Sequence, residues 1–304
     1  MVYTLGESLM DIVFDEDGKI ESGAGGAMLN LSVTLGRCGT EVSLVSELGD
    51  DKVADKITSF LKDNYVNTSL INCYYKQPTS VALAFLDEKR VPTYIFHKSY
   101  PDKRQLKIPR SISSSDILVF GSIYSLDEKI RFQLKQLVDS AKLNNALIVY
   151  DPNIRNAHHL ENKTQRKALI ENIALADIIK GSDEDFMNIF GIEDDEMIIK
   201  EIRKINSQAI IFITKGDKGA MLICRENKFI ADAVRTDVRS TIGAGDNFTA
   251  GIVYFLKKEN INKQDLSIID RIQLENMLRA GIGFSSEVCG SYDNYISKEF
   301  ANSL

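Results

Sequence analysis

The sequence has no tryptophan and only three histidines, five prolines and four cysteines among its 304 residues. So few histidines leave little from which to build a His/Cys metal site or a serine–histidine–aspartate triad. The four cysteines are far apart and form no Cys-x-x-Cys pair: Cys38, Cys73, Cys224 and Cys289. We therefore expect free thiols in a reducing compartment.

Positive charge and long apolar runs are scarce as well. The chain carries 37 Lys and Arg against 43 Asp and Glu, a net charge of −6 with no basic block, which argues against a nucleic-acid partner. No segment has the apolar length needed to cross a membrane, and the first residues lack the basic start and apolar core of a signal peptide. These absences predict a cytoplasmic protein without a membrane partner.

What the sequence does contain is a regular alternation of short apolar runs and amphipathic stretches. Strands are predicted at residues 2–5, 42–48, 117–120, 147–150, 178–179 and 210–214. Helices are predicted between them, at residues 27–37, 51–64, 126–144, 163–174, 183–190 and 196–206. This alternation favours an α/β fold with a parallel sheet covered on both faces, and ligands in such folds bind at the carboxyl ends of the strands.

One region, residues 67–97, has no helical pattern. Strands are predicted there at 70–75, 80–86 and 93–97, with turns at 77–78 and 87–92. Together with residues 12–20, which carry a hairpin turn at 15–18, they predict a small antiparallel sheet. The pattern fits a lid over a ligand and a plain edge meander equally well.

The most informative stretch is Gly243-Ala244-Gly245-Asp246, which follows a strand-like run at residues 229–238 and opens an apolar segment with helical spacing. The start of a helix presents unpaired N–H groups and the positive end of a dipole, which together bind phosphate. A carboxylate beside an anion site would repel phosphate, unless it serves as the base that deprotonates an attacking hydroxyl. The alternative is that Asp246 simply caps the helix.

A second glycine-rich stretch, Gly23-Ala24-Gly25-Gly26, lies before the predicted helix at 27–37. Glycines in a row let the backbone approach a ligand closely, and Asn30, one turn into that helix, can both donate and accept hydrogen bonds. A flexible surface loop is the alternative. The chain has neither a Walker A string nor the glycine fingerprint of dinucleotide-binding proteins.

These two stretches resemble the two signatures of the ribokinase-like PfkB carbohydrate kinase family. The first is Gly25-Gly26-x-x-x-Asn30 with Leu35-Gly36, and the second is Gly243-Ala244-Gly245-Asp246-x-Phe248. Further matches stand between them in order, so that the resemblance covers the whole chain: Gly6-Glu7-x-x-x-Asp11, Leu48-Gly49-Asp50-Asp51, Asp151-Pro152-Asn153-x-Arg155 and Thr214-x-Gly216-x-x-Gly219.

The resemblance implies a ribokinase-like three-layer α/β/α core with a mostly parallel sheet and a small antiparallel lid. It implies one kinase domain over residues 1–304, with the lid at about 12–22 and 67–108. The implied activity is transfer of a phosphoryl group from ATP, with Mg²⁺, to a sugar hydroxyl, and fructose is favoured because the chain is most similar to fructokinase-type and ketodeoxygluconate kinase-type members. Ketodeoxygluconate, ribose or a nucleoside as substrate, and a non-catalytic sugar sensor, stay open as alternatives.

The resemblance also implies roles for individual residues. Asp246 is the implied general base, and the transferring phosphoryl group is implied to lie at the backbone N–H groups of Gly243, Ala244 and Gly245. Sugar contacts are implied for Asp11, Gly25, Gly26, Asn30, His97, Lys98, Asn153 and Arg155. Nucleotide contacts are implied for Thr214, Gly216, Gly219 and Gly283. An indirect part in magnesium binding is implied for Asp185 or Glu184.

Three further expectations concern cations, phosphate and assembly. Ser240 and Ile242 stand where K⁺-activated relatives supply ligand oxygens, so we expect no K⁺ activation. Lys98 and Arg104 offer an alternative in which the substrate is already a phosphosugar. An open lid would expose a strand edge, and a second copy of the chain would cover it, so a homodimer through the lid is expected.

Overall fold

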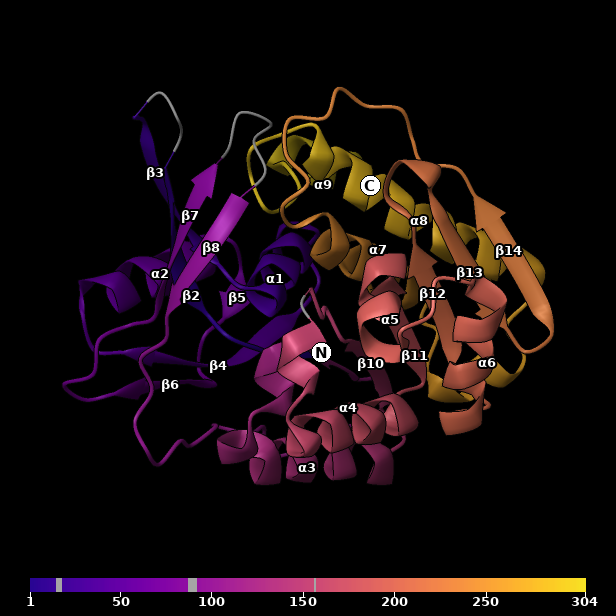
Figure 1. Cartoon of the computed structure of the whole chain (residues 1–304), viewed down its shortest axis with the longest axis horizontal. Coiled ribbons are helices and arrows are strands. Elements are labelled where there is room, and N and C mark those ends of the chain that lie inside the picture. The colour runs from indigo at the N-terminus through magenta and orange to yellow at the C-terminus, as the bar shows by residue number, and fades with distance from the viewer. Residues whose placement is uncertain (15–17, 87–91, 156) are drawn as a thin grey trace.

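The large sheet of the protein lies between two layers of helices (Figure 1). The computed structural model describes residues 1–14, 18–86, 92–155 and 157–304, so the turns expected at 15–18 and 87–92 lie mostly outside the described residues. The main path of the sheet runs in the order β14-β13-β12-β11-β10-β9-β1-β4-β5, and β6 pairs with β4 beside β5. The predicted α/β fold with a parallel core is confirmed.

Six parallel strands form the centre of the sheet, and their bounds lie within a few residues of the predicted ones: β1 (Val2–Leu5), β4 (Val42–Gly49), β9 (Ile117–Gly121), β10 (Leu147–Asp151), β11 (Ile178–Ser182) and β12 (Ile210–Thr214). Two antiparallel strands extend one edge, β13 (Ala220–Cys224) and β14 (Asn227–Ala231). At the other edge β5 (Val66–Asn67) and β6 (Ile71–Tyr74) both pair in parallel with β4. The strand predicted at 70–75 therefore belongs to the large sheet, and its assignment to the small sheet was wrong.

Each face of the sheet is covered by its own helices. One face carries α1 (Ala27–Arg37), α2 (Lys52–Asp63), α7 (Ala244–Lys258), α8 (Arg271–Cys289) and α9 (Lys298–Ser303). The other carries α3 (Glu128–Leu143), α4 (Lys163–Leu175), α5 (Asp183–Phe190) and α6 (Asp195–Ile205). Four short 3-10 helices complete the described elements: η1 (Ile123–Leu126), η2 (Ala157–Leu160), η3 (Gly216–Lys218) and η4 (Lys263–Ser267).

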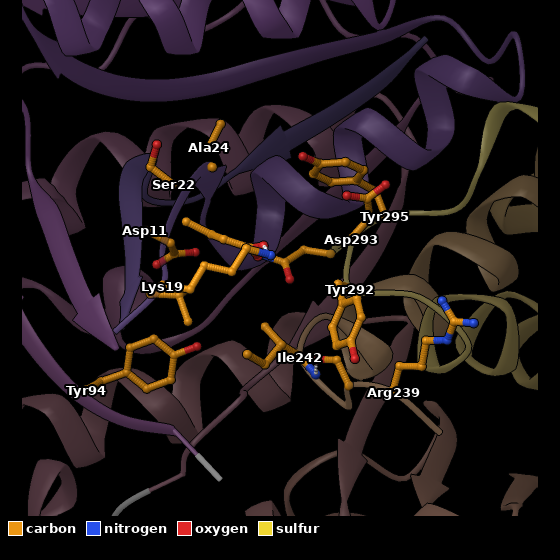
Figure 2. A pocket seen from close by; sticks show the side chains of 15 residues that line it. Asp11, Lys19, Ser22, Ala24, Tyr94, Arg239, Ile242, Tyr292, Asp293 and Tyr295 are labelled. Atoms are coloured by element: carbon orange, nitrogen blue, oxygen red, sulfur yellow. Dashed lines mark hydrogen bonds and ion pairs between the residues drawn. The ribbon is translucent and has the colours of Figure 1, made fainter. Parts of the chain in front are cut away.

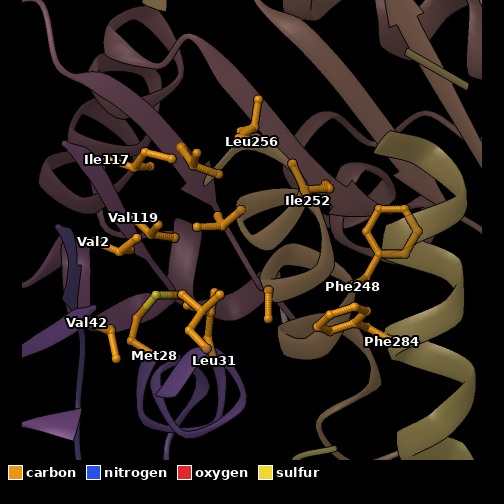
Figure 3. Packing of buried hydrophobic residues seen from close by; sticks show 14 of the residues in the cluster. Val2, Met28, Leu31, Val42, Ile117, Val119, Phe248, Ile252, Leu256 and Phe284 are labelled. Atoms are coloured by element: carbon orange, nitrogen blue, oxygen red, sulfur yellow. The ribbon is translucent and has the colours of Figure 1, made fainter. Parts of the chain in front are cut away.

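The two helix layers follow from the alternation of side chains along buried strands. On β9, Ile117 and Val119 face the cluster that also contains Phe248 and Phe284, whereas Leu118 and Phe120 face the opposite cluster (Figure 3). Because both faces are apolar, these strands read as continuous hydrophobic runs and were predictable from sequence. Most of the helices begin at capping side chains, those of Asp51, Asp127, Asn162, Ser182, Asp194, Asp270 and Ser297.

A separate four-stranded sheet has the order β3-β2-β7-β8. Its strands are β2 (Leu9–Phe14), β3 (Ile20–Gly25), β7 (Val81–Leu86) and β8 (Pro92–His97). The predicted small sheet is present; two of its pairings are antiparallel, and β2 with β7 is parallel. The strand expected over 229–238 was wrong beyond Ala231, because residues 232–239 are mostly exposed and find no strand partner.

The segment that returns from β8 to the large sheet is fixed by Arg104. The guanidinium donates to both oxygens of Glu47, with Nε at 3.2 and 3.1 Å, and pairs with Asp127. It also lies 3.9 Å from the ring centroid of Tyr100 and 4.9 Å from that of Tyr124. The side chain is 1% exposed. Arg104 is therefore fully engaged, and its suggested role in binding a phosphosugar was wrong.

We expect Arg104→Met to lower the free energy of unfolding by about 3–5 kcal/mol, because it leaves the buried Glu47 carboxylate without its partner. Urea unfolding measures this. Arg110→Met, an exposed arginine on the same segment, is the matched control and should change stability by less than about 0.5 kcal/mol. A loss below about 1 kcal/mol for Arg104→Met would show that the pair does not hold the segment.

Candidate active site

The site is built around the first turn of α7. Gly243 precedes this helix with φ at +79°, and a Cβ there would lie 2.6 Å from the carbonyl oxygen of Asn294, so only glycine fits. No side chain caps the helix start. Asp246 is the third residue of the helix, so the alternative that it serves as the N-cap is wrong. Within the first turn the Ala244 N–H donates to the carbonyl oxygen of Thr241 at 3.3 Å, and a helix start without a capping side chain favours an anionic ligand.

The carboxylate of Asp246 is buried, with the residue 4% exposed. Its Oδ2 accepts a hydrogen bond from Asn30 Nδ2 at 2.9 Å, and its Oδ1 lies 3.5 Å from Asn153 Nδ2. Burial raises the pKa of Asp246, and the Asn30 hydrogen bond and the charges of Arg155 and Lys180 oppose that rise. The result is a desolvated carboxylate held mainly by amide donors.

The glycines before α1 bring Asn30 and Asp11 to the same place. Gly26 has φ at +123°, and a Cβ there would lie 2.2 Å from the carbonyl oxygen of Glu7. A Cβ on Gly25 would lie 1.9 Å from Oδ2 of Asp11. The Oδ1 atom of Asn30 is buried and has no hydrogen-bond partner among the described residues. An unsatisfied amide oxygen beside two carboxylates can accept a hydrogen bond from a ligand hydroxyl.

Asp11, on β2, has a strongly shifted pKa. Burial, reinforced by the negative charges of Glu7 and Asp246, raises the pKa of Asp11 to about 7, while Arg155 acts in the opposite direction. The same surroundings raise the pKa of Tyr94, on β8, to about 12, burial being the main cause. Groups with shifted pKa values gather where ligands bind, which marks this corner of the small sheet.

A cavity of about 360 Å³ opens between the small sheet and the chain segments around α7 (Figure 2). Asp11 and Tyr94 line it from one side, and Ile242, Tyr292 and Tyr295 from the other. Its full lining is Asp11, Val13, Lys19, Glu21, Ser22, Gly23, Ala24, Tyr94, Arg239, Ser240, Ile242, Tyr292, Asp293, Asn294 and Tyr295. Two of the proposed features, the glycine-rich stretch and the loop before Gly243, thus face one cavity.

Of the other residues expected to contact the sugar, Asn153, Arg155 and Lys98 lie near the site, whereas His97 does not. Asn153 lies beside Asp246 and accepts from Arg155 Nε at 3.2 Å, and Lys98 Nζ lies 3.0 Å from Glu7 Oε2. His97 does not join them. Strand register pairs it with Val81, on the face of β8 opposite to Tyr94, so the expectation that His97 faces the sugar was wrong.

The residues expected at the nucleotide lie outside the lining of this cavity. Thr214 ends β12, Gly216 and Gly219 flank the tight turn into β13, and Gly283 lies on α8. A Cβ added to Gly283 would meet nothing within 4 Å, so that part of α8 borders open space.

Asp185 and Glu184 are neighbours on α5 but differ in burial. Asp185 is 5% exposed, and its Oδ2 accepts from the backbone N–H of Ser182 at 2.8 Å, whereas Glu184 is exposed. Of the two, only Asp185 faces the buried carboxylates, so Glu184 is corrected to a surface residue. The described residues hold no group of three His, Cys, Asp or Glu side chains that could bind a metal alone. A magnesium ion here would fit only with phosphate oxygens and water as most of its ligands.

Four buried residues near Asp246 were given no role from the sequence: Asp151, Lys180, Asn247 and Thr249. Lys180 Nζ lies 3.1 Å from Asp151 Oδ2, which also accepts from Thr249 Oγ1 at 2.8 Å. Asn247 donates from Nδ2 to the carbonyl oxygens of Gly243 and Asn294, both at 2.8 Å. A lysine directly after the two isoleucines of a buried strand was the available signal, because lysine is rarely buried without a reason.

A parallel sheet between two helix layers, with a glycine-flanked helix start and a small β-sheet beside it, defines a ribokinase-like protein. Residues 1–299 match the model of the pfkB family carbohydrate kinases, and the chain belongs to that family. It is therefore an ATP-dependent sugar kinase. Among the described residues no helix is both long and apolar enough to cross a membrane.

Similar proteins agree with the family. The chain is 28% identical over 285 residues to a fructokinase of Rhizobium leguminosarum bv. trifolii, covering 91% of this chain and 86% of the relative. It is 27% identical to probable fructokinase-4 of Arabidopsis thaliana, covering 83% and 81%. The fold matches a fructokinase from Vibrio cholerae O395, solved with fructose, ADP and calcium ion, at a TM-score of 0.87, 21% identity and coverage of 99% and 97%.

The raised pKa of Asp11 predicts a pH-dependent stability. The folded carboxyl titrates near 7 and the unfolded one near 3.8, so between these values the native state binds more protons and its stability falls as the pH rises. Asp11→Asn should remove this loss and gain up to about 4 kcal/mol over wild type between pH 4 and 7. Urea unfolding at both pH values measures it, with the exposed Asp63→Asn as control. A pH-independent difference for Asp11→Asn would contradict the shift.

Proposed function

We propose that the protein transfers the γ-phosphoryl group of ATP to a hydroxyl of fructose, with Asp246 as the general base. The hydroxyl oxygen forms a bond to the γ-phosphorus, the bond from that phosphorus to the ADP oxygen breaks, and the hydroxyl proton passes to the Asp246 carboxylate. The observation that carries this proposal is the placement of a buried carboxylate on the first turn of an uncapped helix.

The surroundings of Asp246 suit a base. Asn30 occupies Oδ2 at 2.9 Å, whereas Oδ1 has only the long 3.5 Å contact with Asn153 and is free to take a proton. Burial raises the pKa of Asp246, which strengthens it as a base. The first-turn N–H groups of Gly243, Ala244 and Gly245 would stabilise charge on the transferring phosphoryl group. Magnesium, when bound with ATP, would neutralise the phosphate oxygens, with Asp185 as the nearby carboxylate.

Fructose is favoured by the names of the relatives, which are fructokinases. In this proposal Asp11, Asn30, Asn153 and Arg155 bind the sugar beside Gly25 and Gly26, and Lys98 stays paired with Glu7. Thr214, Gly216, Gly219 and Gly283 bind the nucleotide. A K⁺ site stays outside the proposal, because Ile242 has no side-chain oxygen and Ser240 Oγ already accepts from the N–H of Ile242 at 3.2 Å.

Sugar-dependent ADP release tests the activity. A panel of fructose, ribose, ketodeoxygluconate and fructose phosphates should give the highest kcat/KM with fructose. Asp246→Asn should lower kcat by about 100-fold or more, because an amide cannot accept the proton. Its melting temperature should stay near that of wild type, since the amide can still accept from Asn30. Near-normal turnover by this variant would remove Asp246 as the base, and a better substrate than fructose would revise the specificity alone.

The small sheet is proposed as a lid over the cavity, and its outer face as a dimer interface. Phe14 and Phe85 stack there with ring centroids 4.8 Å apart, and register places Ile20 beside Phe14. Ile20, Phe85 and Ile95 are 61%, 42% and 48% exposed. Apolar side chains gathered on the outer face of an edge sheet fit the same face of a second copy.

Light scattering tests the dimer. Wild type should have twice the mass of the chain, and Ile95→Lys should yield the monomer, because a lysine would be desolvated in the interface. Phe132→Lys replaces an even more exposed apolar residue, on α3, and should leave the dimer intact. A monomeric wild-type protein at assay concentration would overturn this part of the proposal.

A further inference from the structure

Lys180 is the one buried lysine beside α7 in the described chain. It lies on β11 with its side chain 4% exposed, and its partner Asp151 is fully buried at the end of β10. Among the described residues the ammonium donates one hydrogen bond, to Asp151 Oδ2 at 3.1 Å. An ammonium has three donors, so two N–H groups are left without a protein acceptor in a desolvated place.

The position of Nζ is defined by Gly245. A Cβ built on Gly245 would lie 2.8 Å from Nζ of Lys180, so the ammonium rests directly against the second residue of α7. That residue belongs to the first turn, whose N–H groups have no capping side chain. The cation therefore lies against an uncapped helix start, one residue before Asp246 in the chain.

The charges around Lys180 keep it protonated. Burial alone would lower its pKa, but the carboxylates of Asp151, Asp185 and Asp246 outweigh burial and raise it. A purely structural ion pair would not account for this arrangement. Asp151 Oδ1 is buried and unsatisfied as well, and a buried pair with unmet donors and acceptors on both sides is costly to fold. An anionic ligand at Nζ would satisfy the free donors.

We propose that Lys180 is a catalytic residue whose ammonium binds a non-bridging oxygen of the γ-phosphoryl group as it moves from ATP to the sugar. This inference rests on the proposed function. The bonds made and broken are those of the proposed transfer, and Lys180 keeps its proton throughout. Asp151, which is held by Thr249, is a positioning residue that orients the ammonium toward the first turn of α7.

The arrangement favours the transition state over bound ATP. The transferring group carries spread negative charge on its three equatorial oxygens, and a fixed ammonium in a desolvated site stabilises that charge without reorganising. A neutral side chain of similar length would keep most of the side-chain volume but would remove the charge. Lys180 should therefore act on kcat far more than on the KM of either substrate.

The test uses Lys180→Met, Lys180→Arg and Asp151→Asn. Lys263→Met is the matched control, because Lys263 also pairs with a carboxylate, that of Asp177 at 2.8 Å, but away from Asp246. Lys180→Met should lower kcat at least 100-fold with both KM values within about threefold of wild type. Lys180→Arg should retain more activity than Lys180→Met. Asp151→Asn should lose less activity than Lys180→Met. Lys263→Met should be unchanged.

A binding measurement separates catalysis from structure. Calorimetry with ADP, Mg²⁺, aluminium fluoride and fructose, which mimic the transferring group, should show affinity lost in Lys180→Met, while affinity for ADP alone is kept. Equal losses of affinity for the aluminium fluoride mixture and for ADP alone, or a kcat of Lys180→Met within threefold of wild type, would overturn the inference. If Lys180→Met does not fold, the same comparison with Lys180→Gln decides, since unchanged kcat and aluminium fluoride binding in this neutral variant would overturn the inference. Wild-type protein without sugar-dependent ADP release would instead overturn the proposed function.

Discussion

The site depends on the contact between α1 and the start of α7, two helices more than 200 residues apart in the chain. Asn30 and Thr34, one turn apart on α1, meet Asp246 and Asn247, adjacent on α7, through two buried hydrogen bonds. Asn247 then reaches the carbonyl of Gly243, which fixes the turn that precedes the helix. Losing one partner of such a bond would leave a buried polar group unsatisfied, at about 1–3 kcal/mol. The same bonds that hold the helices together thus set the orientation of the carboxylate.

A second constraint is charge. Four aspartates lie around the site, and burial raises the pKa of Asp11 to about 7 and that of Asp151 to about 6. Lys180 and Arg155 offset only part of this negative charge, Lys180 from the buried side and Arg155 from the exposed side. A site with excess carboxylate has unfavourable interactions that a magnesium ion and sugar hydroxyls would relieve. Polyphosphate alone would add to the repulsion, so metal and nucleotide are best bound together.

The sequence predicted the large sheet well because local patterns define it. The bounds of α1 and α5 match the predicted ranges, since the glycines before α1, the capping box of α5 and the apolar periodicity of each helix all lie within one segment. Strand pairing could not be predicted from single segments in this way. Residues 71–74 look like any edge strand, and only the register with β4 places them in the large sheet. His97 was misplaced because the side that a strand residue faces depends on its partner. Lys180 was missed because the predicted strand ended at residue 179, whereas β11 continues to Ser182, and because the approach of Gly245 is not visible in one segment.

The Gly-Ala-Gly-Asp motif takes its meaning from its neighbours in space. Gly243 is required by its positive φ and by the carbonyl of Asn294, whereas Gly245 has no positive φ and leaves room for the ammonium of Lys180. A side chain at 245 would displace the cation from the helix start and leave Asp151 unpaired. The second glycine of the motif and the lysine in β11 are therefore best understood together, because the glycine lets the ammonium lie against the helix start.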